Sequence, residues 1–154
     1  MTLFSYYSNT NEKLIKVDNS TSTYEVAKRL WAFANWSRFV RPGATRVGSS
    51  GGGGGVKTAA FRNVDGSIAV VAISSGASAA SVTIKISGAG AAAPKTVEAY
   101  VSDNTHNCEK TAATVADDRT ITGSVAGRSI TTFFVSSAAG GAAPAAPAAL
   151  SAVS

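Results

Sequence analysis

The sequence has few of the residues that usually carry chemistry. Its 154 residues include one cysteine, one histidine, one methionine and only 15% charged side chains. The single cysteine, Cys108, cannot form a disulfide within the chain, so it is either a free thiol or half of a bridge to a partner elsewhere. No apolar run approaches the roughly 18 residues that span a bilayer, which predicts that the chain has no membrane helix and no membrane partner.

Neither end of the chain has the pattern of a targeting or folded segment. Residues 1–7 lack the basic stretch and the long apolar stretch of a secretory signal peptide. We therefore expect either an intracellular protein or a chain whose true beginning lies upstream of Met1. Residues 137–154 are rich in alanine, proline and glycine and carry no charge, so we expect a disordered tail or the start of a linker.

Positive charge is concentrated in the first part of the chain. Residues 1–62 hold nine lysines and arginines against three acids, whereas residues 63–154 hold five against six. A basic surface of this kind is one signature of nucleic-acid binding. Because these charges form no run and no known binding motif, we predict a solvated or domain-facing surface and no nucleic-acid partner.

One amphipathic helix is predicted near the beginning, after a polar and irregular segment 1–21 that we expect to be a loop. Ser22 and Glu25 have the spacing of a capping box, in which each side chain bonds the other's backbone amide. Apolar positions then recur at helical spacing and predict a buried stripe of Val26, Leu30, Phe33 and Ser37. The stripe is predicted to be wide, because Ala27, Trp31 and Ala34 flank it. The segment 41–43, Arg-Pro-Gly, ends the helix.

After residue 44 the apolar period changes from helical to two, which is typical of half-buried strands. Val82, Ile84 and Ile86 alternate with polar residues, and 68–73 is a continuous apolar run typical of a central strand. Seven strands are predicted, at residues 45–49, 57–62, 68–73, 82–86, 96–102, 119–122 and 129–135. The fold class predicted is therefore mostly β, an antiparallel β-sandwich over 44–136 preceded by one α-helix within 1–43.

The predicted helix carries more aromatic surface than a sandwich face readily covers. Its Trp31, Phe33, Trp36 and Phe39 together with Leu30 would contribute on the order of 10 kcal/mol if they were fully buried. A larger neighbouring domain would provide that cover.

Three stretches resemble one family when taken in order. Residues 28–44, KRLWAFANWSRFVRPGA, resemble the last barrel helix and the Arg-Pro-Gly turn of glycoside hydrolase family 30. Residues 61–71, FRNVDGSIAVV, resemble its hairpin and central strand, and residues 127–133, GRSITTF, resemble its closing strand. Within the family the sequence most resembles fungal endo-β-1,6-galactanases, and the resemblance covers about residues 3–136.

The resemblance implies a carboxy-terminal piece of an extracellular retaining hydrolase, whose substrate is a polysaccharide such as β-1,6-galactan. Family members are expected to place two catalytic glutamates on a (β/α)8 barrel, with carboxyl groups roughly 5 Å apart. No glutamate of this chain matches either position, so no catalytic residue is assigned and the chain alone is not expected to be an enzyme. The alternatives are a free-standing carbohydrate-binding or interaction module, and an inactive truncated product.

Other candidate sites are weak. Tyr6 and Tyr7 would lie in the loop after the eighth barrel strand, on the sugar-binding face, although packing under the helix is the simpler interpretation. Asn19 begins the sequon Asn-Ser-Thr in a predicted loop, and Asn35 begins a second sequon within the predicted helix, where we expect no glycan.

No cofactor or metal is predicted. The segment 103–108 holds Asp103, His106 and Cys108, but a structural zinc site needs four ligands, usually as two separated pairs, and no second pair exists. The glycine run 51–55 is followed by Val56 and then a predicted strand, whereas a phosphate-binding loop has its lysine directly after glycine and a helix after that. We expect a surface turn and a hairpin connection instead.

Overall fold

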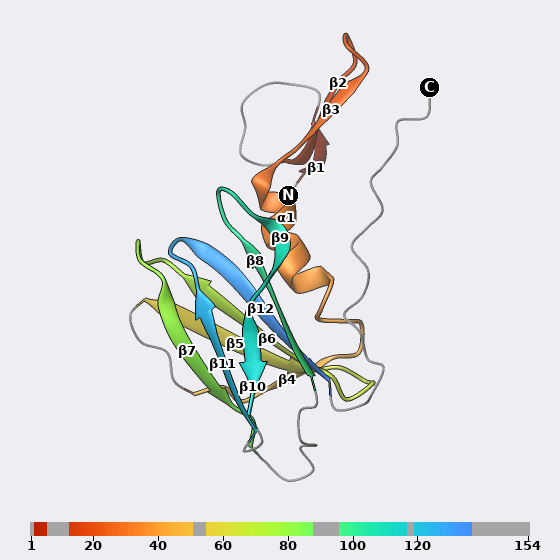
Figure 1. Cartoon of the computed structure of the whole chain (residues 1–154). Coiled ribbons are helices and arrows are strands. Elements are labelled where there is room, and N and C mark those ends of the chain that lie inside the picture. The colour runs from red at the N-terminus through yellow and green to blue at the C-terminus, as the bar shows by residue number, and fades with distance from the viewer. Residues whose placement is uncertain (1, 6–12, 51–54, 88–95, 117–118, 137–154) are drawn as a thin grey trace.

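The computed structural model describes residues 2–5, 13–50, 55–87, 96–116 and 119–136, which form one helix and twelve strands in three sheets (Figure 1). The strand order is β1-β2-β3 in a sheet at the beginning of the chain, β4-β5-β6-β12-β8-β9 in the largest sheet, and β10-β11-β7 in the sheet that faces it. The elements are β1 Thr2–Ser5, β2 Lys13–Asp18, β3 Thr23–Val26, α1 Lys28–Ser37, β4 Thr45–Val47, β5 Val56–Arg62, β6 Ile68–Ser74, β7 Ala80–Lys85, β8 Thr96–Ser102, β9 Asn107–Thr111, β10 Ala113–Val115, β11 Thr120–Val125 and β12 Ser129–Ser136.

The seven strands predicted after residue 44 are all present, as β4, β5, β6, β7, β8, β11 and β12, so the antiparallel sandwich is confirmed. Period-two patterning identified them because one face of each strand is buried between the sheets. In β7, residues Val82 and Ile84 point inward and alternate with exposed neighbours, as predicted. The continuous apolar run in β6 lies between β5 and β12, where both faces of the sheet are covered.

The interpretation of residues 1–25 was wrong. The segment expected to be a loop contains β1 and β2, and Ser22 to Glu25 form no capping box. Ser22 lies in the turn between β2 and β3 with φ +53°, and Glu25 pairs with Lys16 across the two strands. The helix begins instead at Lys28, and Ala27 at its N-cap makes no side-chain capping bond. Pairing with β2 provides the backbone hydrogen bonds of residues 23–26. The strand conformation also suits the β-branched and aromatic side chains of this segment.

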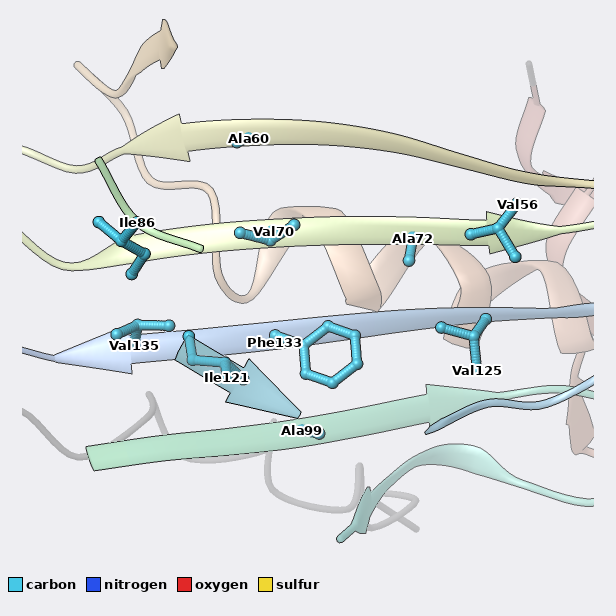
Figure 2. Close-up of a cluster of buried hydrophobic side chains, with 10 residues drawn as sticks. All are labelled: Val56, Ala60, Val70, Ala72, Ile86, Ala99, Ile121, Val125, Phe133 and Val135. Atoms are coloured by element: carbon cyan, nitrogen blue, oxygen red, sulfur yellow. The ribbon is translucent and has the colours of Figure 1, made fainter. Parts of the chain in front are cut away.

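The main core lies between the six-stranded and three-stranded sheets (Figure 2). Phe133 on β12 stands near its centre, and every residue of β12 is buried because the strand is central in the largest sheet. The buried members of this cluster are Val56, Ala60, Val70, Ala72, Ile86, Ala99, Ile121, Val125, Phe133 and Val135.

Gly123 on β11 is required where the sheets approach each other. A Cβ built there would lie 2.5 Å from Cε1 of Phe133, whose ring is enclosed and cannot withdraw. We expect Gly123→Ala to lower the free energy of unfolding by about 1–3 kcal/mol through overpacking. Urea unfolding followed by circular dichroism measures the loss.

The same experiment includes a rescue and a control. Adding Phe133→Leu to Gly123→Ala should cost less than the sum of the two single changes, because the smaller side chain removes the clash. A Cβ on Gly48 would meet nothing within 4 Å, so Gly48→Ala should change stability by no more than about 0.5 kcal/mol. Strict additivity of the first pair would contradict the proposed contact.

Helix α1 covers the other face of the six-stranded sheet, where it contacts β8, β9 and β12, and also β2 (Figure 1). The face that it turns to the sheet agrees with the predicted stripe at its flanking residues Trp31 and Ala34, but not at Phe33 and Ser37. Trp31, Ala34 and the fully buried Asn35 lie against the sheet, whereas Phe33 is 49% exposed and Ser37 is exposed. Burial of Asn35 on this side is favourable because its amide donates to Ser102 Oγ on β8. Within the described ranges no helix is long and apolar enough to cross a membrane.

Candidate functional site at the helix–sheet junction

The most elaborate arrangement of side chains in the described residues is the junction between α1 and the six-stranded sheet. Asn35 is its centre: the Nδ2 amide donates to Ser102 Oγ at 2.5 Å and to the carbonyl oxygen of Trp31 at 3.2 Å. Ser102 Oγ in turn donates to the same carbonyl at 3.0 Å. Thr132 Oγ1 donates to the main-chain carbonyl oxygen of Asn35 at 2.7 Å. These bonds attach the helix to β8 and β12, which are far away in the sequence.

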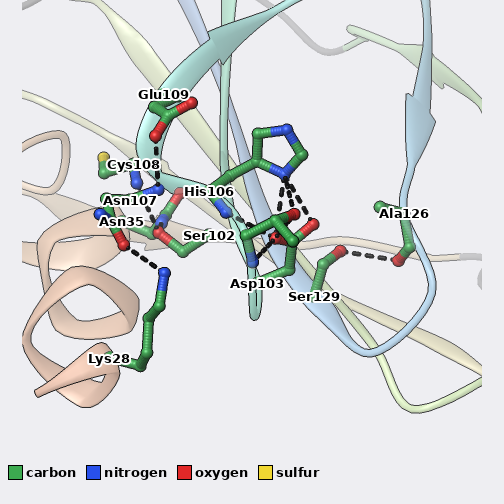
Figure 3. Close-up of polar contacts among 11 residues, drawn as sticks. Lys28, Asn35, Ser102, Asp103, His106, Asn107, Cys108, Glu109, Ala126 and Ser129 are labelled. Atoms are coloured by element: carbon green, nitrogen blue, oxygen red, sulfur yellow. Dashed lines mark hydrogen bonds and ion pairs between the residues drawn. The ribbon is translucent and has the colours of Figure 1, made fainter.

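A bulge in β9 completes this network (Figure 3). Val101 pairs with Glu109 and Ser102 pairs with Asn107, so Cys108 is the extra residue, with φ +56°. The bulge lets the Cys108 amide donate to Ser102 Oγ at 2.9 Å. Ser102 thereby connects three elements with a single hydroxyl group.

An aromatic cluster lies beside the polar network. Phe39, fully buried just after the helix, packs on Tyr100 with ring centroids 4.8 Å apart and on Phe134 at 5.7 Å. The guanidinium of Arg38 lies 4.4 Å from the centre of the Tyr100 ring, at cation–π distance. The sheet therefore accommodates more of the helix's aromatic surface than the sequence led us to expect.

The end of the helix is held by Asn63 in the β5–β6 hairpin. Its Nδ2 amide donates to the carbonyl oxygen of Phe39 and to Ser67 Oγ, both at 2.9 Å, and its Oδ1 accepts from the Arg41 amide at 3.0 Å. Gly43 then reverses the chain with φ +83°, as the Arg-Pro-Gly segment predicted. The helix is thus fixed to the sandwich along its whole length.

The titration behaviour of the junction does not favour catalysis. Burial raises the pKa of the Cys108 thiol although Arg38 opposes the shift, so the nucleophilic thiolate is disfavoured. Burial also raises the pKa of Tyr100, and the nearby Glu98 carboxylate adds to this effect. Cys108 is buried and unpaired within the described residues.

The described carboxylates are engaged in local interactions. Asp103 accepts hydrogen bonds from His106 and Thr105; partial burial acts against them, but they lower the pKa of Asp103 below its ordinary value. Hydrogen bonds from Ser20 and Ser67 likewise lower the pKa values of Asp18 and Asp65. A general acid for glycoside cleavage needs a raised pKa, and the shifted carboxyls of the described segments all move the other way.

The structure also bears on the other candidate sites near β9. His106 is bonded to Asp103 with its side chain 46% exposed, while Cys108 is buried toward the helix, so the three residues of 103–108 are not gathered. No group of three or more histidines, cysteines and acids is positioned to hold a metal ion in the part of the chain that the structure describes. Of the glycine run, residues 51–54 lie outside the described residues, and the strand predicted after it is β5.

The aromatic side chains of the sandwich do not form a sugar-binding platform. All four aromatics after residue 44 are described: Tyr100, Phe133 and Phe134 are buried, and Phe61 packs edge-on against Trp36. These positions leave no exposed row of rings on either sheet, which a free-standing carbohydrate-binding module would need. A pocket beside β8, β9 and β11 contains no phenylalanine, tyrosine or tryptophan; it is lined by Val101, His106, Lys110, Thr111, Ser124 and Ala126.

The predicted site residues fall in different places. Tyr6 and Tyr7 lie outside the described residues, so their contact with a sugar stays a prediction. Asn19 lies exposed in the turn between β2 and β3. Sequence reasoning missed Asn35, Ser102 and Thr132 as a group, and the only available signal was an unexplained asparagine within an apolar helix.

Comparison with known proteins identifies what this architecture is similar to. Residues 43–133 match the family model described as the glycosyl hydrolase family 30 beta sandwich domain. The catalytic domain of a family 30 xylanase C from Talaromyces cellulolyticus has TM-score 0.70 and 35% identity, covering 80% of this chain and 27% of that one. A family 30 endoxylanase from Clostridium papyrosolvens has TM-score 0.65 and 27% identity, with coverage of 78% and 30%.

A third structure, a family 30 subfamily 8 xylanase from Clostridium acetobutylicum, supports the fold alone, with 22% identity and TM-score 0.68 over 83% of this chain and 32% of that one. The chain therefore spans about a third or less of the length of the solved structures that it matches.

Proposed function

Since the chain belongs to the family of glycosyl hydrolase family 30 β-sandwich domains, a carboxy-terminal part of these hydrolases, we propose that it acts as a rigid support for a (β/α)8 barrel. In this proposal residues 1–43 are the end of the barrel, 44–136 are the sandwich and 137–154 are a tail. The described residues contain no such barrel, and hydrolysis is assigned to the whole protein and not to this chain alone.

The observation that carries the proposal is the two-sided character of α1. One side is fixed to the sheet by Asn35 and Phe39, which are both fully buried. The other side presents Phe33, which is 49% exposed, between the exposed residues Arg29 and Ser37. A half-exposed phenylalanine on a helix that is otherwise firmly packed is expected where another domain covers it.

The substrate proposed for the whole protein is a polysaccharide cleaved outside the cell with retention of configuration. Xylan is supported by the two structures above 25% identity, which are named as a xylanase and an endoxylanase. A β-1,6-galactan is the second candidate, proposed from the resemblance of about residues 3–136 to fungal endo-β-1,6-galactanases. No catalytic residue is assigned among the described residues of the sandwich. In this proposal the barrel therefore determines which of the two polysaccharides is cleaved.

We expect the purified chain to release no reducing ends above blank from xylan or from β-1,6-galactan, because no glutamate of its sequence matches either catalytic position of the family. In a chimera, the chain would replace the matching segment of the Talaromyces xylanase C, and this hybrid protein should hydrolyse xylan. Reducing-sugar assays on both polysaccharides measure the two outcomes. Robust turnover by the chain alone would contradict the proposal.

A surface variant of the chimera tests the docking side. Phe33→Asp should lower the melting temperature of the chimera, because it places a charge between helix and barrel. Thr83→Asp, which adds the same charge at an exposed position of β7, should leave it unchanged within about 2 °C. Equal effects of the two variants would show that α1 does not face the barrel.

A further inference from the structure

The structure gives a physical basis for the different expectations at the two sequons. The second sequon, Asn35-Trp36-Ser37, begins at an asparagine that is fully buried, and its Nδ2 amide is already bonded to Ser102 Oγ and the Trp31 carbonyl. A sugar on that nitrogen would have to occupy the space of the sheet. In the folded protein Asn35 is therefore closed to modification.

The first sequon, Asn19-Ser20-Thr21, has the opposite surroundings. All three residues are exposed in the turn that joins β2 and β3, and this hairpin projects away from the sandwich (Figure 1). Asp18 Oδ1 shapes the turn by accepting from the Ser20 amide at 2.9 Å and from the Ser20 hydroxyl at 2.6 Å. Among the described residues none is hydrogen-bonded to the Asn19 side chain.

We propose that Asn19 is a site of N-linked glycosylation and that Asn35 is not. The donor is an oligosaccharide carried on a lipid diphosphate. The Asn19 amide nitrogen bonds to C1 of the first sugar and loses a proton, the bond between C1 and the diphosphate oxygen breaks, and the lipid diphosphate leaves. Glycosylation of Asn19 in the organism rests on the proposed extracellular location, because the protein must then pass through the secretory pathway. Whether Asn19 can accept a glycan depends only on its exposure in the turn.

The position of Asn19 fits a bulky, solvated group. It lies at the tip of the hairpin, whereas the contacts of α1 with the sheet are made by Trp31, Asn35 and Phe39. An oligosaccharide there would leave the helix–sheet junction undisturbed. It would also make the two-stranded projection more soluble.

The test is translation of the full chain, preceded by a cleavable signal sequence, in the presence of endoplasmic-reticulum microsomes. The added signal makes the result independent of how the natural protein is targeted. Only chains protected from external protease and still trypsin-resistant after detergent lysis are analysed, so that folded molecules alone are counted. The readouts are the gel shift removed by peptide N-glycosidase and mass spectrometry of the asparagine converted to aspartate.

The unaltered chain is compared with two single variants. The unaltered chain should carry one glycan, Thr21→Ala should carry none, and Ser37→Ala should carry one. Thr21→Ala removes the first sequon without touching Asn19, and Ser37→Ala does the same for the second at an exposed residue. Folded, protected chains without a glycan, or with a glycan at Asn35, would overturn the proposal, whereas failure of the xylan chimera would not affect it.

Discussion

Truncation of Phe133 to alanine is expected to lower the free energy of unfolding by about 3–5 kcal/mol, which is a large part of the roughly 5–15 kcal/mol that stabilises a typical domain. The ring is fully buried near the middle of the core between the two sheets (Figure 2). Because β12 is paired on both sides, with β6 and with β8, the backbone around the ring cannot collapse to fill the space. The change therefore costs both the transfer energy of the ring and a cavity.

Urea unfolding followed by far-ultraviolet circular dichroism measures this loss as a lower midpoint with an unchanged slope. Val64→Ala is the matched control, because Val64 is 82% exposed and should change stability by no more than about 0.5 kcal/mol. Equal midpoints for Phe133→Ala and the unaltered chain would mean that the two sheets do not share this core.

Replacement of Asn35 by aspartate is expected to be nearly as severe at neutral pH, with a cost of about 3 kcal/mol or more. The substitution keeps the size of the side chain but replaces its donor with an acceptor. A carboxylate there would face the Trp31 carbonyl oxygen and would be left buried without a cation. The hydroxyl of Ser102, which donates to the same carbonyl, could not easily satisfy it.

The sign of the pH dependence follows from burial. Burial and neighbouring acceptors raise the pKa of the new carboxyl in the folded chain above its unfolded value of about 3.9. The destabilisation is therefore smallest below that unfolded value, and it grows as the pH rises toward the folded pKa. Unfolding at pH 3.5 and pH 7, each referred to the unaltered chain at the same pH, should show the difference.

The control for this experiment is Asn104→Asp, the same chemical change at an exposed residue of the turn between β8 and β9. It should be nearly neutral at both pH values. If Asn35→Asp destabilised the chain equally at both pH values, the loss would come from packing and not from a buried charge.

The outcome for α1 shows where sequence reasoning failed at the candidate site. The helix itself was predicted, because apolar residues recur at its period and residues 41–43 end it. Its buried face was predicted only in part: Trp31 and Ala34 lie against the sheet as expected, but Asn35 is buried there and Phe33 is not. Ser102 and Thr132, whose hydroxyls make this burial favourable, lie 67 and 97 residues further along the chain. Local hydropathy carries no information about partners at that distance.

The strands of residues 13–26 and β9 were missed for a related reason. Their side chains have no clear period of two, and they are strands because a partner supplies the backbone hydrogen bonds: β2 pairs with β3, and β9 pairs with β8 through a bulge. The two sequons were separated by their predicted loop and helix contexts, but the cause of the difference lies in the fold. The Asn35 side chain is enclosed by the sheet, and Asn19 is exposed in a turn.

The amino-acid pattern by itself determined the seven strands of the sandwich, the presence of one helix and the likeness to a family 30 hydrolase, because alternation and short motifs are local properties. Only the tertiary structure decided that Asn35 and not Phe33 is buried on the helix, how the Asn35 amide is bonded and how the carboxylates are engaged. Each of these depends on groups that meet across the sheet from distant parts of the chain, and burial and hydrogen bonding are set where they meet.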